Sequence, residues 1–178
     1  MEKKTTFLES TLKSGLLTGL GVVVIMLAGY MLDLTFSKWF GSIGFVVLII
    51  GIIYGTKQVR EFVNKGSISY GQAFGSGILV SAFAGVLIGI FSFVLYKFID
   101  PTLFDKMIAL QEESLLNAGM AEEQIEMGIA MARKMMTPVM MLINSLFTYA
   151  ILGGVLSLVT SAFLKRDQAI NNPFAEEE

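Results

Sequence analysis

Four long stretches of the chain contain no charged residue, and the charged positions lie almost entirely between them. The stretches cover residues 14–32, 39–56, 66–96 and 135–164, and they are 18 to 31 residues long. A helix needs roughly 20 predominantly apolar residues to cross the hydrocarbon core of a bilayer. The pattern therefore predicts an all-α fold, a polytopic membrane protein with four transmembrane helices.

The short connections between the first three stretches predict antiparallel neighbours in one membrane domain over residues 1–178. The expected spans are about residues 12–32, 39–56, 70–96 and 138–164. Gly66 suits the position after a helix end, where φ is positive, and Ser67 or Ser69 can cap the third span. The first stretch is longer than the core of a signal peptide and no small-residue cleavage motif follows it, so we expect a retained span.

The connection between the third and fourth spans is the only sizeable segment outside the apolar stretches. Asp100-Pro101 ends the third span, because the residue before a proline disfavours the α region. Apolar residues then recur at helical spacing on either side of a break at residues 117–119. The pattern predicts an amphipathic helical insertion at about residues 102–134, a hairpin that projects from the bundle or lies along its surface.

Basic residues are distributed unequally between the two sides of the predicted bundle. The side with both termini carries eight Lys and Arg residues, and the opposite side carries five. Cytoplasmic segments near span ends are enriched in Lys and Arg. The bias therefore predicts that the N- and C-termini are cytoplasmic.

The composition excludes several kinds of chemistry. The chain has no cysteine and no histidine, which removes thiolate nucleophiles, Cys/His zinc sites and His-ligated haem. No Asp, Glu, Lys or Arg lies inside the four uncharged stretches, whereas proton relays and ion paths through a bilayer usually need one. The net charge of −2 argues against a nucleic-acid surface. We expect no enzyme activity, no catalytic, metal or cofactor residues, and no nucleic-acid partner.

Small residues recur every fourth position in the third span, at Gly77, Ser81, Gly85 and Gly89. This spacing lets two helix backbones approach closely, so the four residues are candidates for helix packing. The packing can lie inside one bundle or form a dimerisation face. Four spans cannot each bury every small face internally, so a homo-oligomer is compatible with the sequence.

A second group of candidates surrounds the connection between the second and third spans: Lys57, Arg60, Tyr70 and Gln72. One interpretation is structural, with Tyr70 at headgroup depth and Gln72 bonding a neighbouring helix. The other is functional, with Lys57 and Arg60 meeting an anionic lipid headgroup or a partner protein.

Uncharged polar residues also gather in one part of the fourth span, at Asn144, Ser145, Thr148 and Tyr149. Asn144 and Thr148 share a helix face, and we expect this group to bond across the bundle, as glue or as part of a solute path. The methionines between residues 127 and 141 are interpreted as adaptable packing residues at a surface.

The sequence resembles a bacterial four-span membrane-protein family catalogued as a domain of unknown function. The motif that carries the resemblance is Gly51-x-x-Tyr54, then Lys57 and Arg60, then the run from Ile68 to Phe74. The resemblance covers roughly residues 4–166. It implies a small multi-pass protein of the bacterial cytoplasmic (inner) membrane, and it supplies no catalytic or ligand-binding residue.

Two hypotheses of function remain. The first is a contact-based role as an accessory, assembly or scaffold subunit, with membrane lipids around it and a membrane-protein partner bound through residues 102–134. The alternative is an oligomeric transporter or channel for a small solute, lined by uncharged polar residues. The two halves show no inverted repeat of the kind that many transporters have.

Overall fold

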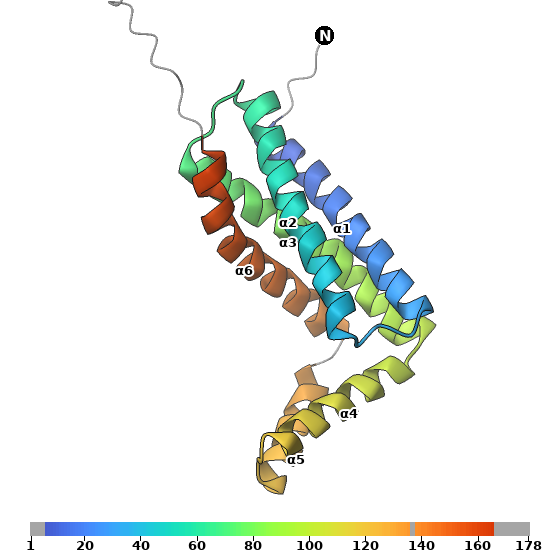
Figure 1. Ribbon diagram of the computed structural model, residues 1–178. Coiled ribbons are helices and arrows are strands. Elements are labelled where there is room, and N and C mark those ends of the chain that lie inside the picture. The colour runs from blue at the N-terminus through green and yellow to red at the C-terminus, as the bar shows by residue number, and fades with distance from the viewer. Residues whose placement is uncertain (1–5, 136–137, 166–178) are drawn as a thin grey trace, which may run out of the picture.

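The protein is a bundle of four long helices with a helical hairpin at one end (Figure 1). The computed structural model describes residues 6–135 and 138–165, and no strand occurs in this part of the chain. Four of its helices are long and apolar enough to cross a membrane. The predicted all-α, four-span fold is confirmed.

The spans are α1, Phe7–Met31; α2, Lys38–Gln58; α3, Tyr70–Val94; and α6, Pro138–Leu164. α2 and α3 each continue into a wide π turn: η1, Val59–Val63, and η2, Leu95–Ile99. α4, Thr102–Asn117, and α5, Glu122–Met135, form the insertion. The start of α1 and the end of α6 lie at the same end of the bundle (Figure 1).

Turn residues end and restart the helices where the sequence predicts. Gly66 has a φ of +94°, and Ser69 is the N-cap of α3. Thr102 bonds back through its amide to the Asp100 carboxylate at 3.0 Å, which starts α4 after Pro101. Gly119, with a φ of +72°, separates α4 from α5. These residues supply the left-handed and capping geometries that a helix end requires.

α3 lies at the centre of the bundle and contacts each of the other three spans. Its contact with α1 depends on glycines of α1. A Cβ added at Gly15 would lie 2.6 Å from the Cβ of Phe83, and one added at Gly19 would lie 3.0 Å from the Cα of Ala84. The backbones approach this closely only because both positions lack a side chain.

The most extensive helix contact is between α3 and α6, where glycine on one helix faces serine on the other. Ser157 fills the space beside Gly77, and Ser81 fills the space beside Gly153. Ser145 lies against Gly89 and donates a hydrogen bond of 3.1 Å to the Gly85 carbonyl. The two helices therefore interlock through small residues on both sides.

The hydroxyls of Ser81 and Ser157 are buried and have no hydrogen-bond partner among the described residues. Each lies where a Cα–H of the opposing glycine points. Weak Cα–H···O contacts recur at helix–helix interfaces of this kind. The hydroxyls thus act as packing groups between two helix backbones.

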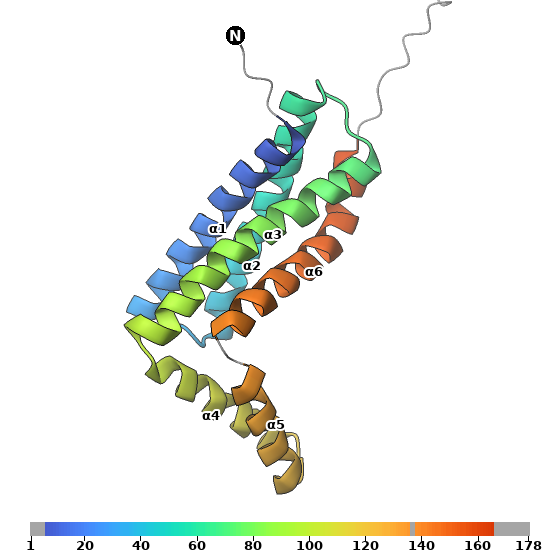
Figure 2. The same cartoon turned by 180° about the vertical axis from the view of Figure 1, so that it is seen from behind.

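The α4–α5 hairpin has a small core of its own. Ile108 and Ile125 are buried, and Leu115 lies beside Gly128. Arg133 approaches Asp105 at 3.4 Å across the hairpin. In both views α4 runs across the direction of the bundle and extends past it on the side of α6 (Figures 1 and 2).

We predict that Gly85→Ala destabilises the bundle and that Gly75→Ala does not. The new Cβ at residue 85 would lie 2.7 Å from the Cβ of Tyr149, whereas nothing lies within 4 Å at residue 75. Overpacking of this kind costs about 1–3 kcal/mol. Unfolding of each variant by titration with a denaturing detergent measures the difference. Equal stability of the two variants would contradict the close α3–α6 approach.

Candidate functional site

The candidates Lys57, Arg60, Tyr70 and Gln72 all lie around the α2–α3 connection, at the bundle end where α1 begins and α6 ends. The structure gives each of them a different set of contacts. They do not line a common pocket among the cavities found in the described part of the chain.

Gln72 holds the start of α3. Its side-chain oxygen accepts a hydrogen bond from the backbone amide of Ser69 at 3.3 Å. The backbone amide of Gln72 donates to the Ser69 hydroxyl, also at 3.3 Å. The Asn64 side chain donates to the same Gln72 oxygen at 3.0 Å. Gln72 therefore forms a capping box and fastens the preceding loop. The partners of Gln72 are Ser69, the N-cap of α3, and Asn64, which directly follows the end of η1.

Tyr70 connects α3 to the end of α6. Its hydroxyl donates to the Leu158 carbonyl at 3.2 Å, and its ring stacks on Phe74 with centroids 6.5 Å apart. The residue is exposed, as a tyrosine in the interfacial belt of a membrane protein usually is. Its contacts thus favour an anchoring role.

Lys57 and Arg60, the two basic candidates, differ in how exposed they are to a potential anionic ligand. Arg60 forms an ion pair of 2.8 Å with its neighbour Glu61, and only 19 % of its side chain is exposed. Lys57 is exposed one turn earlier. A polar groove nearby, between α1 and α2, includes Lys13 and Gln58 but neither basic candidate. Binding of an anion by Lys57 and Arg60 together therefore has little support in the geometry.

The stripe of Gly77, Ser81, Gly85 and Gly89 is buried against α6 of the same chain. None of the four residues faces outward. The structure therefore assigns the stripe to packing within one bundle, and it removes the stripe as a dimerisation face.

The polar group of the fourth span divides into two halves. Ser145 and Tyr149 face α3, where Ser145 bonds the Gly85 carbonyl. Asn144 and Thr148 are exposed on the outer side of α6. The expectation that all four residues bond across the bundle is wrong for these two, because a step of one residue rotates a helix position by about 100°.

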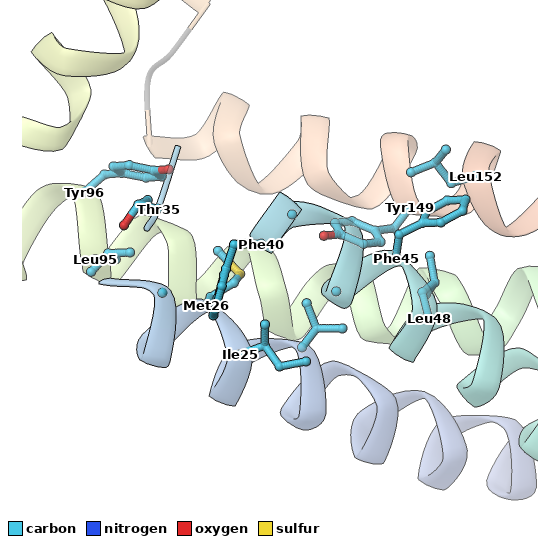
Figure 3. A pocket seen from close by; sticks show the side chains of 14 residues that line it. Ile25, Met26, Thr35, Phe40, Phe45, Leu48, Leu95, Tyr96, Tyr149 and Leu152 are labelled. Atoms are coloured by element: carbon cyan, nitrogen blue, oxygen red, sulfur yellow. The ribbon is translucent and has the colours of Figure 1, made fainter. Parts of the chain in front are cut away.

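An apolar cavity of about 330 Å³ lies between the helices at the end of the bundle near the hairpin (Figure 3). Its walls come from α1, α2, the connection between them, η2 and α6, and its only polar side chains are Thr35, Tyr96 and Tyr149. No ionisable acid or base other than the two phenols lines it. The volume is at the lower end for ligand pockets, and the lining fits an apolar chain such as a segment of a lipid tail.

Sequence reasoning missed this cavity for a physical reason. Its lining consists of apolar residues from four separate segments, and each is an ordinary residue of a membrane span. No local spacing marks them as a group. Only the relative placement of α2 and α6 brings them around one space.

The hairpin presents the most apolar surface outside the spans. Met127, Met131 and Met135 follow one another along a single face of α5 and are 68, 65 and 61 % exposed. Ile125, on the opposite face, is 5 % exposed and packs toward α4. The hairpin also carries an excess of acidic residues: Asp105, Glu112, Glu113, Glu122, Glu123 and Glu126.

The described acidic residues of the hairpin do not form a metal-binding cluster. Within residues 6–135 and 138–165, no three carboxylates come together as a metal site would require. Asp100, at the start of the hairpin, accepts from the Thr102 hydroxyl at 2.5 Å. This hydrogen bond holds the pKa of the Asp100 carboxyl below its usual value. Asp100 is thus a helix-starting carboxylate that stays charged at neutral pH.

The bundle and its surfaces define a multi-pass helical membrane protein with one extramembrane hairpin. The chain matches the family model described as "Protein of unknown function (DUF4199)" over residues 13–166, and it belongs to that family. This confirms the resemblance seen in the sequence. Comparison with curated proteins and with solved structures gave no match.

We predict that Gln72→Ala destabilises the protein by about 1 kcal/mol, the usual cost of losing a cap, while Gln72→Glu retains most of the stability. Glutamate keeps the side-chain acceptor for Ser69 and Asn64, and alanine removes it. Thermal unfolding in a mild detergent measures both variants. If both variants behaved alike, the capping role would fail.

Proposed function

We propose that this protein acts through contacts, as an accessory, assembly or scaffold subunit, and that its α4–α5 hairpin binds another membrane-associated protein. The observation that carries the proposal is the row of exposed methionines on α5. These side chains lie outside the four spans and are 61 to 68 % exposed. Methionine is flexible and polarisable, and it is frequent on surfaces that bind partner helices.

The charges of the hairpin specify the chemistry of the partner. Glu122, Glu123 and Glu126 lie in the first part of α5, close to Met127. A surface that combines methionines with carboxylates fits an amphipathic helix whose apolar face is flanked by Lys or Arg. A basic, amphipathic segment of a membrane protein is therefore the partner that the hairpin favours.

The proposed location is the cytoplasmic (inner) membrane of a bacterium, with both termini in the cytoplasm. The excess of Lys and Arg at the end that carries the termini supports this orientation. The hairpin then lies on the external side, where it meets partners that are exported or that span the membrane.

A non-enzymatic role accompanies this proposal. The interior of the bundle supports it, because the buried hydroxyls of Ser81 and Ser157 are pressed against glycine backbones rather than arranged around a substrate. The same packing gives little support to the alternative of a solute pathway through one bundle. The apolar cavity of Figure 3 adds a place for a lipid chain, which suits a protein that is surrounded by lipid.

We predict that the double variant Met127→Gln and Met131→Gln retains at least about tenfold less of its partner than the wild type. Residues at the centre of an interface often contribute about 1–2 kcal/mol or more each to binding. Tagged full-length protein is extracted gently from its native membrane, and the amount of the co-purifying stoichiometric protein is measured. Ala130→Gln is the matched control, because it introduces the same side chain at an exposed position outside the methionine row.

The variants separate loss of binding from loss of folding. Met127 and Met131 are largely exposed, so both variants should melt within a few degrees of the wild type. Retention of the partner by the double variant, at wild-type level, would exclude this face as the binding surface.

A further inference from the structure

The outer face of α6 carries two polar side chains that the bundle does not use. Asn144 and Thr148 are exposed, and neither makes a side-chain hydrogen bond within the described part of the chain. Thr18 and Thr160 differ, since each donates to a carbonyl of its own helix. The outer face of α6 therefore retains unused hydrogen-bonding capacity.

On a helix centred in the bilayer, Thr148 lies well inside the hydrocarbon core and Asn144 lies just inside its edge. Asn144 is six residues after the start of α6, about 9 Å along the helix, and Thr148 is about 15 Å along it. The helix of 27 residues is about 40 Å long, so its ends extend beyond a hydrocarbon core of about 30 Å. A polar group left unsatisfied in that core is costly.

The same face shows the spacing of a helix–helix seam. Exposed residues follow each other at alternating steps of four and three: Asn144, Thr148, Ile151, Val155, Leu158 and Ala162. This is the heptad pattern of a left-handed coiled coil, with β-branched residues at two of the three a positions. The row lies opposite the face that Gly153 and Ser157 bury against α3.

α6 is also the span with most unburied surface. In its most apolar stretch 11 % of the residues are buried, against 22 to 39 % in the other three spans. The heptad row contains no charged residue, so two identical rows meet without repulsion. A primary amide carries both donors and an acceptor, and it is therefore complementary to its own copy.

We propose that a second copy of this chain packs against α6 through the heptad row, as a parallel dimer with Asn144 paired to Asn144 of its partner. A twofold axis along the membrane normal places the same residue of each copy at the same depth. Asn144 fixes the register, and Thr148 adds a second polar group to the seam. The apolar residues from Ile151 to Ala162 form the rest of the contact.

Cysteine cross-linking tests the seam directly, because the chain has no cysteine of its own. Full-length Ile151→Cys, Val155→Cys and Leu158→Cys are each reconstituted into phosphatidylcholine vesicles at low protein density and treated with a membrane-permeant thiol oxidant. Ile50→Cys on α2 is the control, since Ile50 is 59 % exposed and Ile151 is 64 % exposed. We expect a disulfide-linked dimer from at least one seam position and several-fold less from the control.

A second measurement examines the role of Asn144. In the same vesicles, energy transfer between labelled copies reports the dimer as lipid dilutes it. Asn144→Leu should weaken the dimer roughly threefold to tenfold, while Asn144→Gln stays close to wild type. The stability of the monomer in detergent should not fall in either variant, because Asn144 makes no bond within the bundle.

Two results would overturn the proposal. The first is cross-linking at all three seam positions no stronger than at Ile50, which would mean that lipid covers this face. The second is energy transfer that Asn144→Leu leaves unchanged, because Asn144 would then not be part of the seam.

Discussion

The bundle depends on the close approach of α3 to its neighbours. In a bilayer, helices gain little from the hydrophobic effect when they associate, so van der Waals contact between backbones has to stabilise them. Gly15 and Gly19 let α1 approach α3 on one side, and the glycine–serine pairs let α6 approach on another. This contact determines which face of α6 is buried, and with it which face remains outside.

The same constraint explains the cavity. α3 contacts all three other spans, whereas α2 and α6 contact each other much less. The space left near the hairpin between α1, α2, η2 and α6 is the apolar cavity of Figure 3. It is a consequence of packing three helices around α3 with small residues at two of the interfaces.

The sequence predicts the spans well, because charge is costly in a bilayer and its absence marks each span. It also predicts the ends of the helices, since Gly66, Ser69 and Asp100-Pro101 act through local backbone geometry. It identifies Gly77 to Gly89 as a packing stripe, but the spacing says nothing of the partner, which only the fold reveals to be α6.

Residues whose role depends on rotation about a helix are harder to predict. Ser145 faces α3 and its neighbour Asn144 faces outward, although the two are adjacent in the sequence. Gln72 looked equally suited to bonding a helix, and its partners are Ser69 and Asn64 in the loop. Long-range placement decided the outcome for Ser145 and Asn144, whereas the Ser69–Gln72 capping box is local and follows from the spacing of these two residues.

The bundle leaves exposed the methionine row of α5 outside the membrane and the heptad row of α6 inside it. A parallel dimer through α6 places both hairpins on the same side of the membrane. A partner with two binding segments would then be held more tightly than by one hairpin, because the second binding event is intramolecular.

The most direct test of a contact-based role is the intact mass of the complex, measured by native mass spectrometry after gentle extraction of the wild-type protein at its natural abundance. The account predicts two copies of this chain together with a stoichiometric second protein. Copies of this chain that carry only bound lipid would contradict it.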